Sequence, residues 1–113
     1  MKSDKFYLVY MLECVERINE FTEAGKDAFM GSHLIQDAVL RNLHTLTEST
    51  LRLSEGLRDS YPDVAWKAIA KFRNVVVHDY LGVNLDRVWK IVENDLPVLK
   101  KQARAILDDL GGA

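Results

Sequence analysis

The apolar residues of this chain recur every three or four positions, and this spacing constrains the fold more than any other feature of the sequence. On a helix with about 3.6 residues per turn, such spacing places the apolar side chains on one face. The first segment with this pattern runs from about Asp4 to Thr22, and its apolar positions are Phe6, Val9, Tyr10, Leu12, Val15, Ile18 and Phe21. No segment alternates apolar and polar residues between turn dipeptides, so the sequence predicts an all-α protein.

Ser32 is a suitable N-cap for a long second helix, whose apolar spacing extends to about Leu57. Three polar residues, Asn42, Ser49 and Thr50, lie within the apolar stripe of this helix. Small polar residues at such positions either allow close packing against another helix or carry a polar function. The packing interpretation is the preferred one.

Two prolines and an asparagine mark the ends of the remaining helices. Pro62 follows Tyr61 and is expected in the first turn of a third helix. The N–H groups of that turn have no partner within the helix, so the missing N–H of a proline costs no hydrogen bond there. Asn84 is a suitable N-cap for a last helix, and Pro97 predicts a kink or a short break within that helix. The predicted architecture is an up-down bundle of four helices, or of five if Pro97 divides the last one.

Composition narrows the function classes that are open to the chain. A sequence of 113 residues with 48% apolar and 28% charged residues is typical of one globular domain, which we expect to comprise residues 1–113. The net charge of −2 argues against a broad basic face that coats nucleic acid, but it leaves room for a local phosphate site. Cys14 is the only cysteine and is expected to be buried, which indicates a reduced, cytoplasmic protein. No run of about 18 apolar residues occurs, so neither a membrane span nor a secretion signal is expected.

The stretch 71–80, KFRNVVVHDY, contains three adjacent valines between polar residues. Three valines could form a buried strand, but Val75 and Val76 continue the helical spacing and an isolated strand would have no pairing partner. The sequence therefore predicts that this stretch continues the third helix.

The polar residues of the same stretch carry chemistry that suits RNA cleavage without a metal. His78 can take up and release protons near neutral pH, Arg73 can hold phosphate oxygens, and the Asn74 amide can orient either group. On a helix, Asn74 and His78 share a face, whereas Arg73 lies about 140° around the axis from His78. An alternative stays open, because a histidine beside Asp79 at a helix end can also be a structural group.

One histidine in each chain is one proton carrier too few for a reaction that needs both a base and an acid. A symmetric dimer would remove this shortage, because an isologous contact along the third helix would bring two copies of Arg73 and His78 into one cleft. The sequence therefore predicts a homodimer whose site is incomplete in the monomer.

The motif from Arg73 to Tyr80 resembles the R-x4-H-x-Y pattern of the HEPN superfamily, and within it the HepT-like toxins of type VII MNT–HEPN toxin–antitoxin pairs. Asn74 matches the asparagine that is common after the arginine. The likeness extends over nearly the whole chain, including DAVLRNLHTLTES at 37–49. In the second helix, Thr47-Glu48-Ser49 stands where many relatives have Gly-Glu-Ala, and Glu48 matches a position that is often polar.

This resemblance implies a HEPN-like homodimer in which Arg73 and His78 are the catalytic pair of a metal-independent endoribonuclease, supported by Asn74 and Glu48. It implies no cofactor and no metal. It also implies that an MNT-type nucleotidyltransferase antitoxin attaches adenylate to Tyr80, where the added phosphate beside Arg73 would block RNA. The alternative is a non-catalytic helical module that dimerises and binds the nucleotidyltransferase or a nucleotide.

Other histidines and the aromatic residues suggest weaker candidates. We expect that neither His33 nor His44 has a histidine or glutamate partner at metal-ligand spacing. Both are therefore expected at the surface or its boundary instead of in a metal site. Lysines and arginines make the third helix modestly basic, which could guide RNA or only be solvated. Four aromatic residues could stack on bases, although core or dimer packing is the preferred interpretation for them; they are Tyr7, Tyr10, Trp66 and Trp89.

Overall fold

Helices make up most of the chain in the computed structural model, which describes residues 2–77 and 84–111. The prediction of an all-α protein is confirmed, and these two ranges contain no strand. The elements are α1 (Asp4–Phe21), α2 (Lys26–Met30), α3 (His33–Leu51), α4 (Glu55–Ser60), α5 (Trp66–Val77), α6 (Leu85–Lys90), the π-helical turn η1 (Ile91–Asp95) and α7 (Leu96–Asp109).

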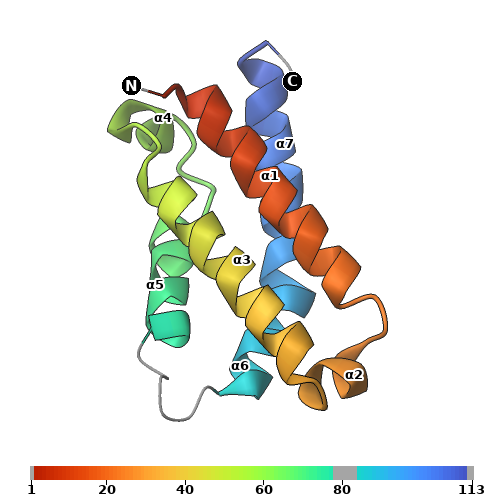
Figure 1. Cartoon of the computed structure of the whole chain (residues 1–113). Helices are drawn as coiled ribbons and strands as arrows, with labels where there is room; N and C mark the ends of the chain where they lie inside the picture. Colours follow the sequence, from red (N-terminus) through yellow and green to blue (C-terminus); the bar gives the residue numbers. More distant parts are fainter. Residues whose placement is uncertain (1, 78–83, 112–113) are drawn as a thin grey trace.

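The long helices run alternately down and up, as the predicted bundle requires (Figure 1). Helix α3 packs against α1 and α5, and α7 packs along α1. Both ends of the chain lie at the same end of the bundle (Figure 1). The core is formed by the inward faces of these helices, and its largest fully buried side chains include Leu8, Met11, Ile18, Phe29, Leu43, Leu46 and Leu96. None of the helices in the described ranges is both long and apolar enough to cross a membrane.

Side-chain caps fix where the helices begin. Ser32 Oγ accepts a hydrogen bond from the Ile35 N–H at 3.2 Å, and Asn84 Oδ1 accepts one from the Arg87 N–H at 3.1 Å. Each cap satisfies one of the N–H groups that the first helical turn leaves without a backbone partner. The predicted caps of the second and last helices are therefore confirmed.

Two predicted boundaries are wrong. The second helix ends at Leu51 instead of Leu57, because Ser54 begins the separate helix α4 by accepting a hydrogen bond from the Leu57 N–H. The Asp4 carboxylate holds Ser54 in place by accepting hydrogen bonds from its N–H at 2.7 Å and its hydroxyl at 2.6 Å. Pro62 lies before α5 instead of in its first turn, because the chain turns once more to bury Val64 before the helix begins.

Pro97 follows an interruption of the last helical run. It lies in the first turn of α7, and the five residues before α7 form the π-turn, in which the Leu96 N–H donates to the Ile91 carbonyl. Proline has no N–H to continue an α-helical ladder, and a π-turn is one way in which a helix accommodates such an interruption.

Polar residues in the apolar stripe of α3 serve packing. Thr47 and Thr50 are buried, and their hydroxyls donate to the carbonyls of Leu43 and Leu46 on the same helix, so the side chains leave no polar atom unpaired. Asn42 donates to a carbonyl one turn earlier in the same way. The burial of Thr50 agrees with the close-packing interpretation, whereas Asn42 is only half-buried. Cys14 is fully buried, and its burial raises the pKa of the thiol.

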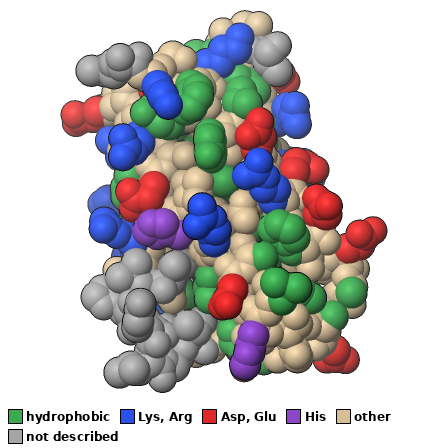
Figure 2. All heavy atoms as spheres, in the orientation of Figure 1, with side chains coloured by type: hydrophobic (Ala, Val, Ile, Leu, Met, Phe, Trp, Pro, Cys, Tyr) green, Lys and Arg blue, Asp and Glu red, His purple; other side chains and the backbone are tan. Residues whose placement is uncertain are grey.

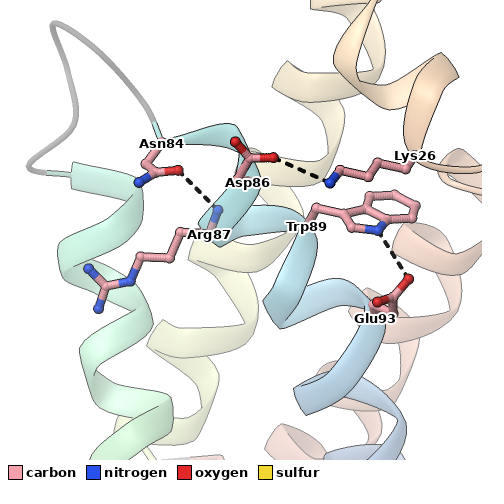
Figure 3. A network of polar contacts seen from close by, with 6 residues as sticks. All are labelled: Lys26, Asn84, Asp86, Arg87, Trp89 and Glu93. Atoms are coloured by element: carbon pink, nitrogen blue, oxygen red, sulfur yellow. Dashed lines mark hydrogen bonds and ion pairs between the residues drawn. The ribbon is translucent and has the colours of Figure 1, made fainter.

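A set of contacts fixes α6, the helix that follows residues 78–83, against α2 (Figure 3). Lys26 Nζ lies 3.3 Å from Asp86 Oδ1, and the Trp89 ring packs on the buried Phe29 ring with centroids 5.4 Å apart. The Trp89 indole N–H donates to Glu93. Because Asn84 caps α6 at the same end, the point at which the chain enters α6 is held by side chains of α2 and α6.

Candidate active site

Helix α5 places Arg73 and Asn74 at the surface. Phe72 and Val75 of this helix are buried in the core, and the helical repeat turns the two residues between them outward. The hypothesis that these two polar side chains are available to a ligand therefore agrees with their exposure. Among the described residues, the Asn74 amide has no side-chain hydrogen bond within the protein.

Arg73 pairs with Glu48 across the contact between α5 and α3. The distance from Arg73 Nε to Glu48 Oε1 is 3.8 Å, and the side chains are 56% and 36% exposed respectively. A separation of this length exceeds that of a charge-assisted hydrogen bond, so the guanidinium is directed by the carboxylate without being tightly held. Glu48 Oε1 is itself buried and has no hydrogen-bond partner within residues 2–77 and 84–111. Arg73 and Glu48 are thus in contact, but Glu48 Oε1 makes no hydrogen bond within the described part of the chain.

The other two residues of the predicted site, His78 and Tyr80, lie outside the described residues. Their predicted places relative to Arg73 stay predictions. The described chain reaches Val77 at the end of α5 and resumes at Asn84, the cap of α6. Of the five residues assigned to the site, the structure therefore brings Arg73 and Glu48 together and leaves Asn74 one position further along α5.

A groove between α1 and α3 lies beside the Arg73–Glu48 pair, and sequence reasoning did not find it. It has a volume of about 670 Å³ and shares Glu48 with that pair. Figure 2 shows hydrophobic side chains over the first half of α1, with lysine and arginine side chains around them. The groove is lined chiefly by Phe6, Tyr7, Tyr10, Glu48, Ser49 and Arg52.

The predicted packing role of the aromatic residues holds for the tryptophans but is incomplete for the tyrosines. The Trp66 indole N–H donates to the carbonyls of Arg58 and Tyr61, and Trp89 packs on Phe29. Tyr7 is half-buried against the core, whereas Tyr10 is 36% exposed and lines the groove. The four-residue spacing of Lys2, Phe6 and Tyr10 was the sequence signal for this exposed row.

The histidines outside the motif lie where the sequence predicted. His33 is exposed and His44 is half-buried. However, the expectation that neither histidine has a partner at ligand spacing is wrong, because His44 and Glu48 are four residues apart on α3 and share one face. Within the described ranges, no three histidine, cysteine or acidic side chains converge as metal ligands would.

The basic residues of α5 are divided between two sides of the helix. Arg73 faces α3, whereas Lys71 lines a separate hollow of about 230 Å³ with Arg87 and Lys90 of α6. The predicted basic face is therefore a set of local clusters instead of one continuous surface.

Comparison with known proteins identifies a family. The family model described as "Ribonuclease HepT-like" matches residues 11–106. A Methanocaldococcus jannaschii protein named "Gamma-glutamylcyclotransferase and putative RNase" is 34% identical over 96% of this chain, and this chain spans half the length of that protein. Another protein of that organism, named "Putative RNase", is 31% identical, with 90% of this chain and 94% of the relative covered. A Thermococcus cleftensis protein named "Probable ribonuclease HepT" is 33% identical, with 88% of this chain and 91% of the relative covered. No solved structure matches the chain.

Proposed function

Because the chain belongs to the ribonuclease HepT-like family, we propose that it is a metal-independent endoribonuclease, the toxin of a toxin–antitoxin pair. The observation that carries the proposal is the exposed Arg73 guanidinium, directed by Glu48 and placed five residues before His78. We assign the activity to one HEPN-like domain, residues 1–113, and to the cytoplasm, where an RNA substrate would be met.

The proposed reaction needs only proton carriers and a cation. One His78 imidazole removes the proton from a ribose 2′-hydroxyl, and the oxygen forms a bond to the adjacent phosphorus. The bond from phosphorus to the 5′-oxygen breaks, and a second imidazole, in its protonated form, gives that oxygen a proton. Arg73 stabilises the charge that develops on the phosphoryl oxygens. The products are a 2′,3′-cyclic phosphate and a 5′-hydroxyl.

The proposal requires two protomers, because each chain supplies a single motif histidine. His78 of one protomer would act as the base and His78 of the partner subunit as the acid, in a cleft on the α5 side of each bundle. Glu48 serves as the positioning residue for Arg73, and Asn74 supports the pair by orienting either the guanidinium or an imidazole.

Removing divalent metals is expected to leave the activity unchanged. Purified protein incubated with RNA in excess EDTA should cleave it, because the proposed steps use side chains only. Mass spectrometry of the products should find 2′,3′-cyclic phosphate ends together with 5′-hydroxyl ends. Cleavage that stops in EDTA and returns with magnesium, or products with 3′-hydroxyl ends, would contradict the mechanism.

We propose that an MNT-type nucleotidyltransferase antitoxin neutralises the toxin by transferring adenylate to the Tyr80 hydroxyl. A phosphodiester near Arg73 would pair with the guanidinium that the reaction needs, and its negative charge would repel RNA phosphates. After co-expression with an MNT-type nucleotidyltransferase, intact-mass spectrometry should show one or more added adenylates. The Tyr80→Phe variant should lack them and stay toxic. Complete neutralisation of an unmodified toxin would instead indicate inhibition by docking.

A further inference from the structure

We propose that the groove between α1 and α3 binds single-stranded RNA beside the cut site, with bases stacked on Phe6 and Tyr10. The inference rests on the proposed ribonuclease function. It adds that the RNA substrate is single-stranded, and it names the residues that bind the RNA. Single-stranded RNA is recognised largely by stacking on aromatic side chains and by cations along its backbone, and this groove presents both.

The aromatic part of the groove is a row of rings at the surface. The Phe6 ring contacts the Tyr7 ring edge to face, with centroids 5.3 Å apart, and lies 5.9 Å from the tilted Tyr10 ring. Phe6 is 39% exposed and Tyr10 is 36% exposed, although both are large apolar groups. Partly exposed aromatic rings gathered at one place suit a planar apolar ligand such as a nucleobase.

Two cations adjoin this row. Lys2 Nζ lies 4.5 Å from the centroid of the Phe6 ring, and Arg52, the C-cap of α3, lines the groove. A lysine held by a ring can turn toward a phosphate at little cost, because both contacts keep its charge at the surface. The hydroxyls of Thr45 and Ser49 on the same wall can bond to a ribose or a base edge.

The groove reaches the proposed catalytic residues through Glu48. This carboxylate lines the groove and also pairs with Arg73, so the groove and the guanidinium share Glu48 as a neighbour. The nearby Asp4 carboxylate is already engaged by two hydrogen bonds from Ser54, which reduces its repulsion of a phosphate. Stacked bases in the groove would therefore position the next phosphate at Arg73.

A second copy of this chain is the other possible occupant, and the lining argues against it. The centre of a protein–protein interface is usually depleted of charged residues. This groove instead carries Lys2, Glu48 and Arg52 around the rings. Cations around exposed rings complement the anionic backbone and planar bases of RNA.

Binding can be tested apart from cleavage with a fluorescent 2′-O-methyl oligonucleotide of about twelve nucleotides, which has no free 2′-hydroxyl to react. By fluorescence anisotropy, Tyr10→Leu should bind about tenfold more weakly, because it keeps apolar bulk and loses the ring. Tyr10→Phe should retain most of the affinity. Arg52→Gln should reduce the slope of log affinity against log salt by about 0.7, as loss of one phosphate contact predicts.

Two variants outside the groove serve as matched controls. Arg104→Gln removes the same charge from α7, and Leu34→Ala removes an exposed apolar side chain from the other end of α3; both should bind like the unaltered protein. Circular dichroism checks that every variant is folded. If the unaltered protein binds and cleaves RNA but Tyr10→Leu and Arg52→Gln bind equally well, the groove proposal is overturned and the ribonuclease proposal stands.

Two further outcomes would also overturn the groove proposal. If Tyr10→Leu changes the sedimentation of the protein from dimer to monomer, the groove is a contact between copies of the chain. If the unaltered protein neither binds the oligonucleotide nor cleaves RNA, the proposed function fails as well. Cross-linking of a 4-thiouridine RNA to a peptide that contains Phe6 or Tyr10 would support the groove proposal directly.

Discussion

The His78→Ala substitution is expected to lower the rate of RNA cleavage by at least ~10³-fold. General acid and base catalysis each contribute about 10²–10⁴-fold, and in the proposed dimer one substitution removes both groups. Initial rates on a defined RNA in EDTA give the ratio, and circular dichroism should show an unchanged helical spectrum. A variant that cleaves as fast as the unaltered protein would refute the catalytic role of His78.

Companion variants separate charge from geometry at the same site. Arg73→Ala should lower the rate by about 10²–10³-fold, because it removes the cation that stabilises the developing charge. Arg73→Lys should recover only part of that loss, because an ammonium cannot bind two phosphoryl oxygens in the planar manner of a guanidinium. Lys67 lies on the same helix, away from the pair, and Lys67→Ala serves as the control with an unchanged rate. Full activity in Arg73→Lys would mean that charge alone is needed.

The Phe29→Ala substitution is expected to lower the free energy of unfolding by about 3–5 kcal/mol, the range for a fully buried aromatic residue cut to alanine. Phe29 is 0% exposed and packs against Trp89, so the change leaves a cavity where α2 meets α6. Gln36 donates hydrogen bonds to the carbonyls of Phe29 and Met30, which limits how far α2 can collapse into that cavity. Urea denaturation followed by circular dichroism measures the difference.

The matched control is Leu34→Ala, because Leu34 is 81% exposed and its loss creates no cavity. Its free energy of unfolding should change by no more than about 0.5 kcal/mol. The free energy of unfolding of Phe29→Leu, in which the leucine fills part of the cavity, should lie between that of Phe29→Ala and that of the unaltered protein. Equal stability of Phe29→Ala and the unaltered protein would show that the contact between α2 and α6 does not support the fold.

Apolar periodicity and capping residues predicted the long helices, and local rules failed where tertiary contacts decide the boundary. Ser32 and Asn84 begin their helices as expected, because a cap acts within one turn of its own chain. Helix α3 ends before Ser54, which caps α4 and is also engaged by Asp4, fifty residues away. No local pattern reveals such a contact. Pro97 predicted an interruption of the last helix, but not that it would take the form of a π-turn before the proline.

The sequence likewise predicted only part of the candidate site. Exposure of Arg73 and Asn74 follows from the burial of their neighbours on α5, which periodicity predicts. The importance of Glu48 came from family resemblance, and its pairing with Arg73 required the packing of α3 on α5. The groove was missed because an aromatic row at four-residue spacing predicts a core face equally well. Only the packed bundle shows that Phe6 and Tyr10 stay at the surface.

The central claim is that two protomers share one catalytic cleft, and a mixed dimer tests it most directly. Two differently tagged chains, one unaltered and one carrying His78→Ala, are co-expressed, and the mixed dimer is purified through both tags. If one imidazole is the base and the other is the acid, this dimer should cleave RNA at less than about a tenth of the unaltered rate. Half of the unaltered rate would show that each protomer acts alone and would contradict the shared cleft.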